Sequence, residues 1–185
     1  MQQDLKFPVN KLEDVYYLSK ITQGQETAIP GIPNLGRIPR ADYIQLIEQA
    51  MRAYEREFKE LDINMVEEVM DLIAYIERII SQPGGCLLLA GRAGVGRKQS
   101  TQLVCHLLNI EFFSPNINRE YGMKEFKRDL KQILLNTGIN AEKTCLFIED
   151  HQLLNDEFLT MINSLLSSGE VPGLYTPEEL EPLLA

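Results

Sequence analysis

The stretch GRAGVGRKQS, residues 91–100, combines glycines and basic side chains in a spacing suited to binding phosphate. In the pattern G-x-x-x-x-G-K-[ST], the glycines let successive backbone N–H groups point inward toward phosphate oxygens, and the following helix adds its positive N-terminal end. Gly91 and Gly96 keep the glycine spacing, but Arg97 takes the lysine position and Lys98 replaces the hydroxyl residue. The backbone part of the pattern is therefore present, and its side-chain part is altered.

The altered positions affect charge and metal binding differently. Arg97 can supply the positive charge of the usual lysine in a bulkier, planar form. Lys98 removes an ordinary Mg²⁺ ligand, and Ser100 and Thr101 would replace it only if the loop slipped in register. We predict a nucleotide site, with a ligand-free strand-to-helix turn as the alternative. The predicted nucleotide-binding residues are Gly91, Ala93, Gly94, Val95, Gly96, Arg97, Lys98 and Gln99.

A second chemical pattern is the apolar run CLFIED, which ends in two carboxylates. An acid at the carboxyl end of a buried strand is typical of a Walker B strand, where it lies near Mg²⁺. If Asp150 is the metal-side acid, His151 takes the place of the water-activating glutamate; if Glu149 is, Asp150 takes that place. Strand alternation allows only one of the two carboxylates to face the site. The alternatives are a surface carboxylate pair and a structural histidine.

Composition excludes several other classes of function. The formal net charge of −9 gives the chain no general attraction for nucleic acid, anionic membranes or microtubules, unless a local basic patch overrides it. Three cysteines (Cys86, Cys105 and Cys145) and two histidines give neither a disulfide framework nor a zinc ligand set. We expect reduced, packed thiols. With neither an apolar signal sequence nor a membrane-spanning run, we expect an intracellular protein without direct membrane insertion.

The elements needed to position these groups alternate between strand and helix. Glycine and proline in residues 1–40 predict an extended N-terminal arm. Apolar stripes at helical spacing predict helices over residues 41–58, 64–81, 123–136 and 158–169, another directly after the glycine loop, and a last one starting at Thr176-Pro177. Residues 86–90 and 144–150 are predicted as buried strands, with a further strand within 110–115. This order predicts an α/β fold with a partial parallel sheet flanked by helices.

Two longer stretches resemble the dynein heavy chains. They are FLTMINSLLSSGEVPGLYTPEEL, with IEDHQ just upstream, and RIISQPGGCLLLAGRAGVGR. In that family the first follows the Walker B strand and the second leads into the phosphate-binding loop. The resemblance covers residues 38–185 and places them in the fourth AAA+ module of the motor ring. Within the family, the chain looks most like the cytoplasmic dynein 2 class, the motors of ciliary retrograde transport.

The resemblance implies the following expectations. Residues 41–185 would be a P-loop NTPase (AAA+) large subdomain, truncated after the Walker B region, and residues 1–40 an arm approaching it. Asp150 would match the Walker B aspartate and bind Mg²⁺, and His151 would stand at the catalytic glutamate's position. The module would therefore hold ADP or ATP with impaired hydrolysis.

The resemblance also implies partners and a location. The expected partners are neighbouring AAA+ modules of the same heavy chain and, through the parent protein, dynein 2 accessory chains and microtubules. The expected location is the cytoplasm, on the cytoskeleton and in the cilium. Two alternatives to a regulatory nucleotide-binding module stay open: a nucleotide-free scaffold and an active small P-loop ATPase.

Overall fold

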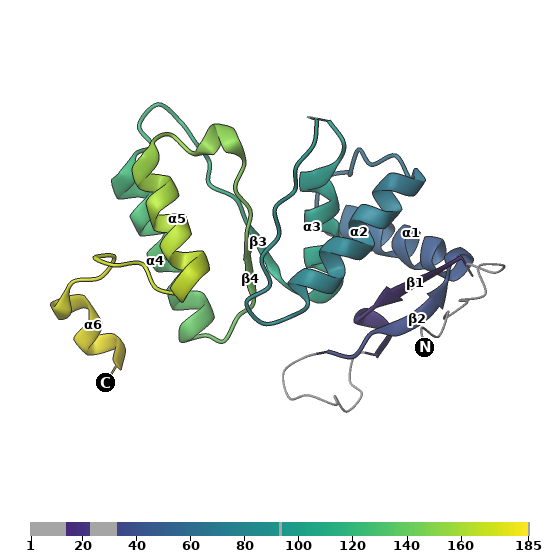
Figure 1. Ribbon diagram of the computed structural model, residues 1–185, viewed down its shortest axis with the longest axis horizontal. Coiled ribbons are helices and arrows are strands. Elements are labelled where there is room, and N and C mark those ends of the chain that lie inside the picture. Colours follow the sequence, from purple (N-terminus) through teal and green to yellow (C-terminus); the bar gives the residue numbers. More distant parts are fainter. Residues whose placement is uncertain (1–13, 23–32, 93, 185) are drawn as a thin grey trace, which may run out of the picture. The chain divides into compact units, whose positions relative to one another are not determined.

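A computed structural model describes residues 14–22, 33–92 and 94–184 (Figure 1). The contacts between Cα atoms divide the chain into two compact units. The first takes the residues up to Leu87 together with Gly91–Ser100, and the second takes Leu88–Ala90 together with Thr101–Ala185. Each unit buries apolar side chains of its own.

The first unit packs a pair of short strands against two helices. Its elements are β1 (Val15–Leu18), η1 (Lys20–Thr22), β2 (Gly36–Pro39), α1 (Arg40–Glu57) and α2 (Glu67–Ile80). β1 and β2 pair antiparallel, with Val15 opposite Pro39 and Leu18 opposite Gly36. β1 contacts α2 and β2 contacts α1 (Figure 1). The described parts of the predicted arm thus form an antiparallel pair.

Helix α1 buries a face rotated from the predicted stripe. The sequence pattern ran through Ile44, Ile47, Met51, Tyr54 and Phe58. The buried residues are instead Tyr43, Ile47 and Ala50, while Phe58 is 56% exposed. Tyr43 can be fully buried because its hydroxyl donates a hydrogen bond to the backbone carbonyl of Met70 at 2.8 Å. Satisfying that polar atom allows the aromatic ring to join the core.

The buried face of α2 includes one carboxylate. Glu77 is fully buried beside apolar residues of the same helix. Its oxygens accept hydrogen bonds from the Ser19 amide at 3.1 Å, the Ser19 hydroxyl at 2.6 Å and the Lys20 amide at 2.9 Å. A buried charge is tolerated when such donors surround it. Glu77 therefore fixes the turn after β1 to α2.

The prediction of a strand buried on both faces over residues 86–90 is wrong. This segment forms no strand, Leu88 is 91% exposed, and Cys86 is exposed as well. A strand requires a neighbour to take up its backbone hydrogen bonds. Among the described residues, strands pair only as β1 with β2 and β3 with β4. The apolar run alone was therefore insufficient to produce a buried strand.

The second unit carries a short parallel sheet with helices. Its elements are β3 (Glu111–Phe113), α4 (Met123–Gly138), β4 (Thr144–Leu146), η2 (Asp150–Gln152), α5 (Asp156–Ser168), α6 (Pro177–Leu184) and all but the first turn of α3 (Arg97–Leu108). β3 and β4 pair in parallel, with Phe112 opposite Cys145. The pairing agrees with the predicted α/β class, but the predicted strand over 144–150 ends at Leu146 and is half-buried.

The core of the second unit lies between α4 and α5, which run side by side (Figure 1). The rings of Phe126 and Phe158 stack there with centroids 4.6 Å apart. The remaining buried members of this core are Tyr121, Leu130, Met161, Val171 and Leu174. Within the described part of the chain, no helix is both long and apolar enough to cross a membrane.

The predicted C-terminal end of α5 and the predicted start of α6 are confirmed. Gly169 caps α5 in the left-handed conformation, at φ 74°. At the start of α6, the Thr176 amide donates to Glu179 at 2.9 Å, and the Glu179 amide donates to the Thr176 hydroxyl at 3.3 Å. This reciprocal pair is a capping box.

Candidate functional site

The glycine loop adopts a conformation that requires glycine at two positions. Gly94 has φ +85° and Gly96 has φ +75°, a region that residues with a Cβ rarely adopt. The Ser100 amide donates to the Gly96 carbonyl at 2.7 Å, so α3 begins directly at the end of the loop. Gly94 and Val95 are exposed. The loop is thus a solvent-facing turn leading into a helix N-terminus, where anions are favoured.

Arg97 reaches back toward the start of the loop. A Cβ placed on Gly91 would lie 3.9 Å from Nη1 of Arg97, so the guanidinium group lies beside Gly91. Lys98 and Gln99 follow in the first turn of α3, half-buried. The predicted site residue Ala93 lies outside the described residues. The structure thus places the charged group of Arg97 against the start of the glycine turn.

A buried hydroxyl lies next to the same turn. Ser100 is fully buried, and its Oγ has no hydrogen-bond partner in the described part of the chain. A Cβ on Gly96 would lie 3.8 Å from this oxygen. Buried polar atoms nearly always have a hydrogen-bond partner, so an unsatisfied hydroxyl beside the loop is unusual. The exposed glycine turn and the guanidinium group beside it form an arrangement that can receive an anion, whereas the buried Ser100 hydroxyl does not face solvent.

The predicted acidic residues lie on a turn after β4. The strand ends at Leu146, and η2 begins at Asp150. Glu149 is half-buried, whereas Asp150 and His151 are exposed. The alternation of side chains along a strand therefore does not extend to these residues. Their directions depend on the turn, which belongs to the second unit, whereas the loop 91–100 belongs to the first.

The described side chains do not form a metal cage made of protein ligands alone. No group of three or more His, Cys, Asp or Glu side chains that could hold a metal occurs within residues 14–22, 33–92 and 94–184. Mg²⁺ commonly uses one or two carboxylates together with water and substrate phosphates, and does not require an all-protein cage. A single exposed carboxylate such as Asp150 suits that mode.

The three cysteines differ in environment, and the prediction that they are packed is wrong for Cys86, which is exposed. Cys105 on α3 is buried, and Cys145 on β4 is half-buried. A hydrogen bond between their side chains, together with burial, raises the pKa of the Cys105 thiol. Cys105 therefore stays protonated and acts as a packed core residue.

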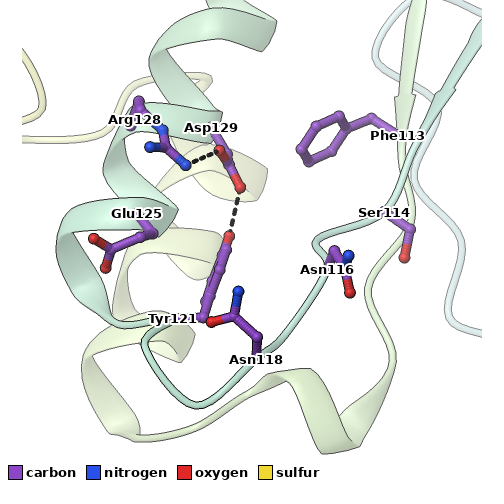
Figure 2. Close-up of a pocket in the computed structure, with 8 residues that line it drawn as sticks. All are labelled: Phe113, Ser114, Asn116, Asn118, Tyr121, Glu125, Arg128 and Asp129. Atoms are coloured by element: carbon purple, nitrogen blue, oxygen red, sulfur yellow. Dashed lines mark hydrogen bonds and ion pairs between the residues drawn. The ribbon is translucent and has the colours of Figure 1, made fainter.

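The second unit contains a pocket that the sequence did not indicate. It has a volume of about 320 Å³ and lies between the segment after β3 and the first turns of α4 (Figure 2). The Tyr121 hydroxyl donates to Asp129 at 2.7 Å, and Arg128 lies 3.6 Å from the same carboxylate. Burial and this hydrogen bond raise the pKa of Tyr121. The charged groups of Arg128 and Asp129 neutralise one another, and we assign no ligand to the pocket.

Gln152 is a further residue that sequence reasoning did not identify as functional. It ends η2, directly after His151, and is only 4% exposed. A primary amide buried to this extent requires hydrogen-bond partners. In the sequence it appeared only as the last letter of IEDHQ, a polar residue in a polar stretch. No local pattern distinguishes such a buried amide from an exposed one.

Comparison with known proteins identifies the family. A family model described as "P-loop containing dynein motor region D4" matches residues 61–185. The cytoplasmic dynein 2 heavy chain 1 of Tripneustes gratilla is 50% identical over 156 residues, which is 84% of this chain and 4% of that protein. The human protein of the same name is 48% identical over 166 residues, 90% of this chain and 4% of its own length.

More distant relatives agree. The cytoplasmic dynein 2 heavy chain 1 of Caenorhabditis elegans is 37% identical over 177 residues, 94% of this chain and 4% of that protein. The chain thus spans about 4% of the length of these relatives. The predicted resemblance to dynein heavy chains is confirmed, since the family model covers more than half of the chain. The chain belongs to the family of the P-loop containing dynein motor region D4.

Proposed function

We propose that this chain is part of a microtubule minus-end-directed motor of the cytoplasmic dynein 2 type, and that its D4 module holds ADP or ATP with little or no hydrolysis. The observation that carries the proposal is the glycine turn. Gly94 and Gly96 adopt positive φ values at the start of α3, and the Arg97 guanidinium lies beside Gly91. This arrangement presents backbone donors and one fixed positive charge to an anion.

The binding roles follow from the loop geometry. The backbone N–H groups of residues 94–98 would hold phosphate oxygens at the N-terminus of α3, and Arg97 would pair with their charge. Asp150, on the second unit, is proposed separately as a Mg²⁺ ligand, as the family resemblance implies. These roles use the features of the phosphate loop that the sequence retains.

Poor hydrolysis is proposed from the substituted positions. His151 stands where the family resemblance places the catalytic glutamate, and Lys98 stands where a hydroxyl would bind Mg²⁺. Neither substitution removes the backbone donors of the loop. A module that binds nucleotide without turning it over would act structurally, tuning the motor ring while another module supplies the power stroke.

The wider role is proposed from the relatives. Several of them are named cytoplasmic dynein 2 heavy chain 1. We therefore propose intraflagellar retrograde transport, in the cytoplasm and on the cytoskeleton of the cilium. The module would contact neighbouring AAA+ modules of its own heavy chain, and the heavy chain would engage dynein 2 accessory chains and microtubules. The net charge of −9 suggests that this module does not itself contact the acidic microtubule surface.

Hydrogen–deuterium exchange of the intact heavy chain tests nucleotide binding at this module alone. Peptides covering residues 91–100 should exchange more slowly when Mg²⁺·ADP or Mg²⁺·ATP is added. Gly96→Val forces a β-branched residue to φ +75°. We expect it to raise the nucleotide concentration that gives half of this protection by about ten- to a hundredfold.

Gly138→Val is the matched control for that variant. Gly138 is the exposed last residue of α4, and a Cβ added there would meet no atom of the described residues within 4 Å. We expect unchanged nucleotide protection in the control. If millimolar nucleotide gave no protection in the unsubstituted protein, the binding half of the proposal would be wrong, and the nucleotide-free scaffold would replace it.

A second measurement tests the hydrolysis half. His151→Ala should leave the steady-state rate of Mg²⁺-dependent phosphate release unchanged, because the imidazole would have no catalytic task. A large loss of turnover in this variant would contradict impaired hydrolysis and favour the active P-loop ATPase instead.

A further inference from the structure

Two cysteines of the second unit, Cys105 and Cys145, lie next to one another although they are far apart in the chain. Cys105 belongs to α3 and Cys145 to β4, and both residues fall within the second unit. Their side chains are hydrogen-bonded to one another. Two adjacent thiols can undergo a reaction that a single thiol cannot, because one sulfur can attack a bond that the other has formed.

The backbone brings the last turn of α3 to the sheet. The Ile110 amide donates to the Cys105 carbonyl at 2.8 Å, across Asn109, which has φ +54°. Such a left-handed residue ends many helices, and here it turns the chain directly into β3. The Glu111 amide then donates to the Lys143 carbonyl at 2.8 Å. These backbone bonds tie the end of α3 to β3, and β3 to the start of β4.

The pleat of β4 directs Cys145 to one side of the sheet. Leu146 packs against the core between α4 and α5. Successive side chains of a strand point to opposite faces, so Cys145 points away from that core. Phe112 lies opposite Cys145 in the parallel register, and its ring contacts that of Phe147 with centroids 5.6 Å apart. The thiol of Cys145 therefore lies on the face of the sheet that is turned away from α4 and α5, where Cys105 bonds to it.

The two thiols differ in access and in acidity. Cys105 is 1% exposed, whereas Cys145 is half-buried. The hydrogen bond from Cys105 lowers the pKa of the Cys145 thiol, against the opposing effect of its burial. The thiolate is the nucleophile in exchange with a disulfide. Cys145 is therefore the thiol that a small reagent reaches and reacts with first.

We propose that Cys105 and Cys145 form a modification site, at which a low-molecular-weight disulfide converts the two thiols into one reversible disulfide bond between α3 and β4. The inference does not depend on the proposed nucleotide function. In a reducing compartment such a bond is transient and forms when the supply of small disulfides rises.

The reaction proceeds in two exchange steps. The Cys145 thiolate attacks one sulfur of the small disulfide, which forms a mixed disulfide and releases one small thiol. The Cys105 sulfur then attacks the Cys145 sulfur, which forms the bond between the two cysteines and releases the second small thiol. The two cysteine sulfurs supply two electrons to the small disulfide, and the two cysteine protons end on the two released thiols.

Mass spectrometry of the intact heavy chain tests whether the bond forms. The folded protein is treated with glutathione disulfide, free thiols are blocked with N-ethylmaleimide, and the chain is digested with trypsin without reductant. We expect the peptides of Cys105 and Cys145 as one linked pair, two hydrogens lighter than their sum and separated by dithiothreitol. Cys86, which is exposed, should carry glutathione instead. If Cys86 carried glutathione while Cys105 and Cys145 stayed free, the inference would be wrong.

Single alanine variants test the order of the two steps. In Cys105→Ala, Cys145 should stop at the mixed disulfide with glutathione, because no second thiol displaces it. In Cys145→Ala, Cys105 should stay free, because it is buried. Cys86→Ala is the matched control and should leave the linked pair unchanged. A glutathione adduct on Cys105 together with a free Cys145 would overturn the assignment of Cys145 as the first nucleophile.

Deuterium exchange of the unsubstituted heavy chain tests whether the bond restrains α3. After oxidation, peptides covering residues 101–108 and 144–147 should exchange about tenfold more slowly, and dithiothreitol should restore the original rates. Exchange in α5 should not change, and oxidation of Cys105→Ala should have no effect on residues 101–108. A linked pair whose formation left these rates unchanged would contradict a tie between α3 and β4.

Discussion

Buried polar side chains in this chain differ sharply in how well they are satisfied. Glu77 receives three hydrogen bonds from the turn after β1, and Gln152 uses both polar atoms of its amide. Ser19 and Ser100 are both buried serines of the first unit. Ser19 donates to Glu77, whereas the Ser100 hydroxyl has no partner within the described residues. The same residue type should therefore contribute to stability in opposite directions.

Alanine substitution of these two serines tests that contrast. Ser19→Ala removes a hydrogen bond to a charged group and should lower the free energy of unfolding by about 1.5–3 kcal/mol. Ser100→Ala removes a buried hydroxyl without a partner and should leave stability unchanged or raise it by up to about 1 kcal/mol. Urea denaturation measures both. A loss above about 1 kcal/mol in Ser100→Ala would mean that its hydroxyl has a partner after all.

At the residue scale, sequence predicted the loop better than the buried polar contacts. The spacing of Gly91 and Gly96 indicated a glycine-rich turn, and Gly96 has a positive φ, which glycine adopts readily. The bond between Ser19 and Glu77 joins residues 58 positions apart, and the bond from Gln152 to Pro115 spans 37 positions. No local pattern contains information about such distant partners. Buried polar anchors of this kind become visible only once the fold is known.

At the scale of elements, a charged side chain on α4 bonds to the first turn of α6. Lys131 on α4 donates to both carboxylate oxygens of Glu179, at 2.6 and 2.7 Å. The Tyr175 hydroxyl donates to the Lys131 carbonyl at 3.1 Å, just before α6 begins. The hydrogen bond from Lys131 and a second from the Thr176 amide lower the pKa of Glu179. Attachment of α6 should therefore depend on pH.

The direction of that dependence follows from the lowered pKa. A carboxyl group with a lower pKa in the folded state stabilises fully above its unfolded value of about 4.3. The contribution is lost as the pH falls through the lower, folded value. We expect the contact between Lys131 and Glu179 to weaken in acid, below the unfolded pKa of Glu179, and Lys131→Met to move the pKa of Glu179 upward toward that unfolded value. Nuclear magnetic resonance of the Glu179 carboxyl and of the α6 amides measures both changes.

The control for this titration is Glu178→Gln, at the neighbouring exposed position. It leaves the bonds between Lys131 and Glu179 in place, so the transition should occur at the same pH. A transition that moved equally in both variants would show that the general negative charge of α6 controls its attachment, and not this specific pair.

Helices were easier to predict than strands for a physical reason. The expected helix at 123–136 appears as α4, Met123–Gly138, because its apolar spacing and hydrogen bonds are local. A strand's hydrogen bonds depend on a neighbour elsewhere in the chain. The segment 144–150 meets β3 over only three residues, and 86–90 meets no strand within the described residues. Both segments are apolar runs of the kind that predicts a buried strand, but only the segment that begins at residue 144 forms one.

At the scale of the whole molecule, apolar side chains are divided unevenly between core and surface. Leu103 on α3 is fully buried, whereas Leu88 is 91% exposed. Leu87, next to it, is 37% exposed. Adjacent exposed leucines favour association with other apolar surfaces. The stability of the chain should therefore be insensitive to Leu88, and its solubility should not.

Leu88→Ser tests this expectation. The variant should change the free energy of unfolding by less than about 0.5 kcal/mol, because little apolar surface is buried there. It should also lower self-association, measured by light scattering at increasing protein concentration. Leu103→Ala, the buried comparison, should cost about 2–5 kcal/mol. A loss of that size in Leu88→Ser would contradict the exposed position of this side chain.

The division of the chain into two units has a consequence for how it can be taken apart. The chain passes from the first unit to the second after Leu87, returns after Ala90, and leaves again after Ser100. No single break in the polypeptide separates the two sets of residues. Grafting, splicing or exchanging one unit between related proteins would require three joints, all within or beside the segment that carries the glycine turn. A single crossover between two related genes therefore cannot exchange one unit without part of the other.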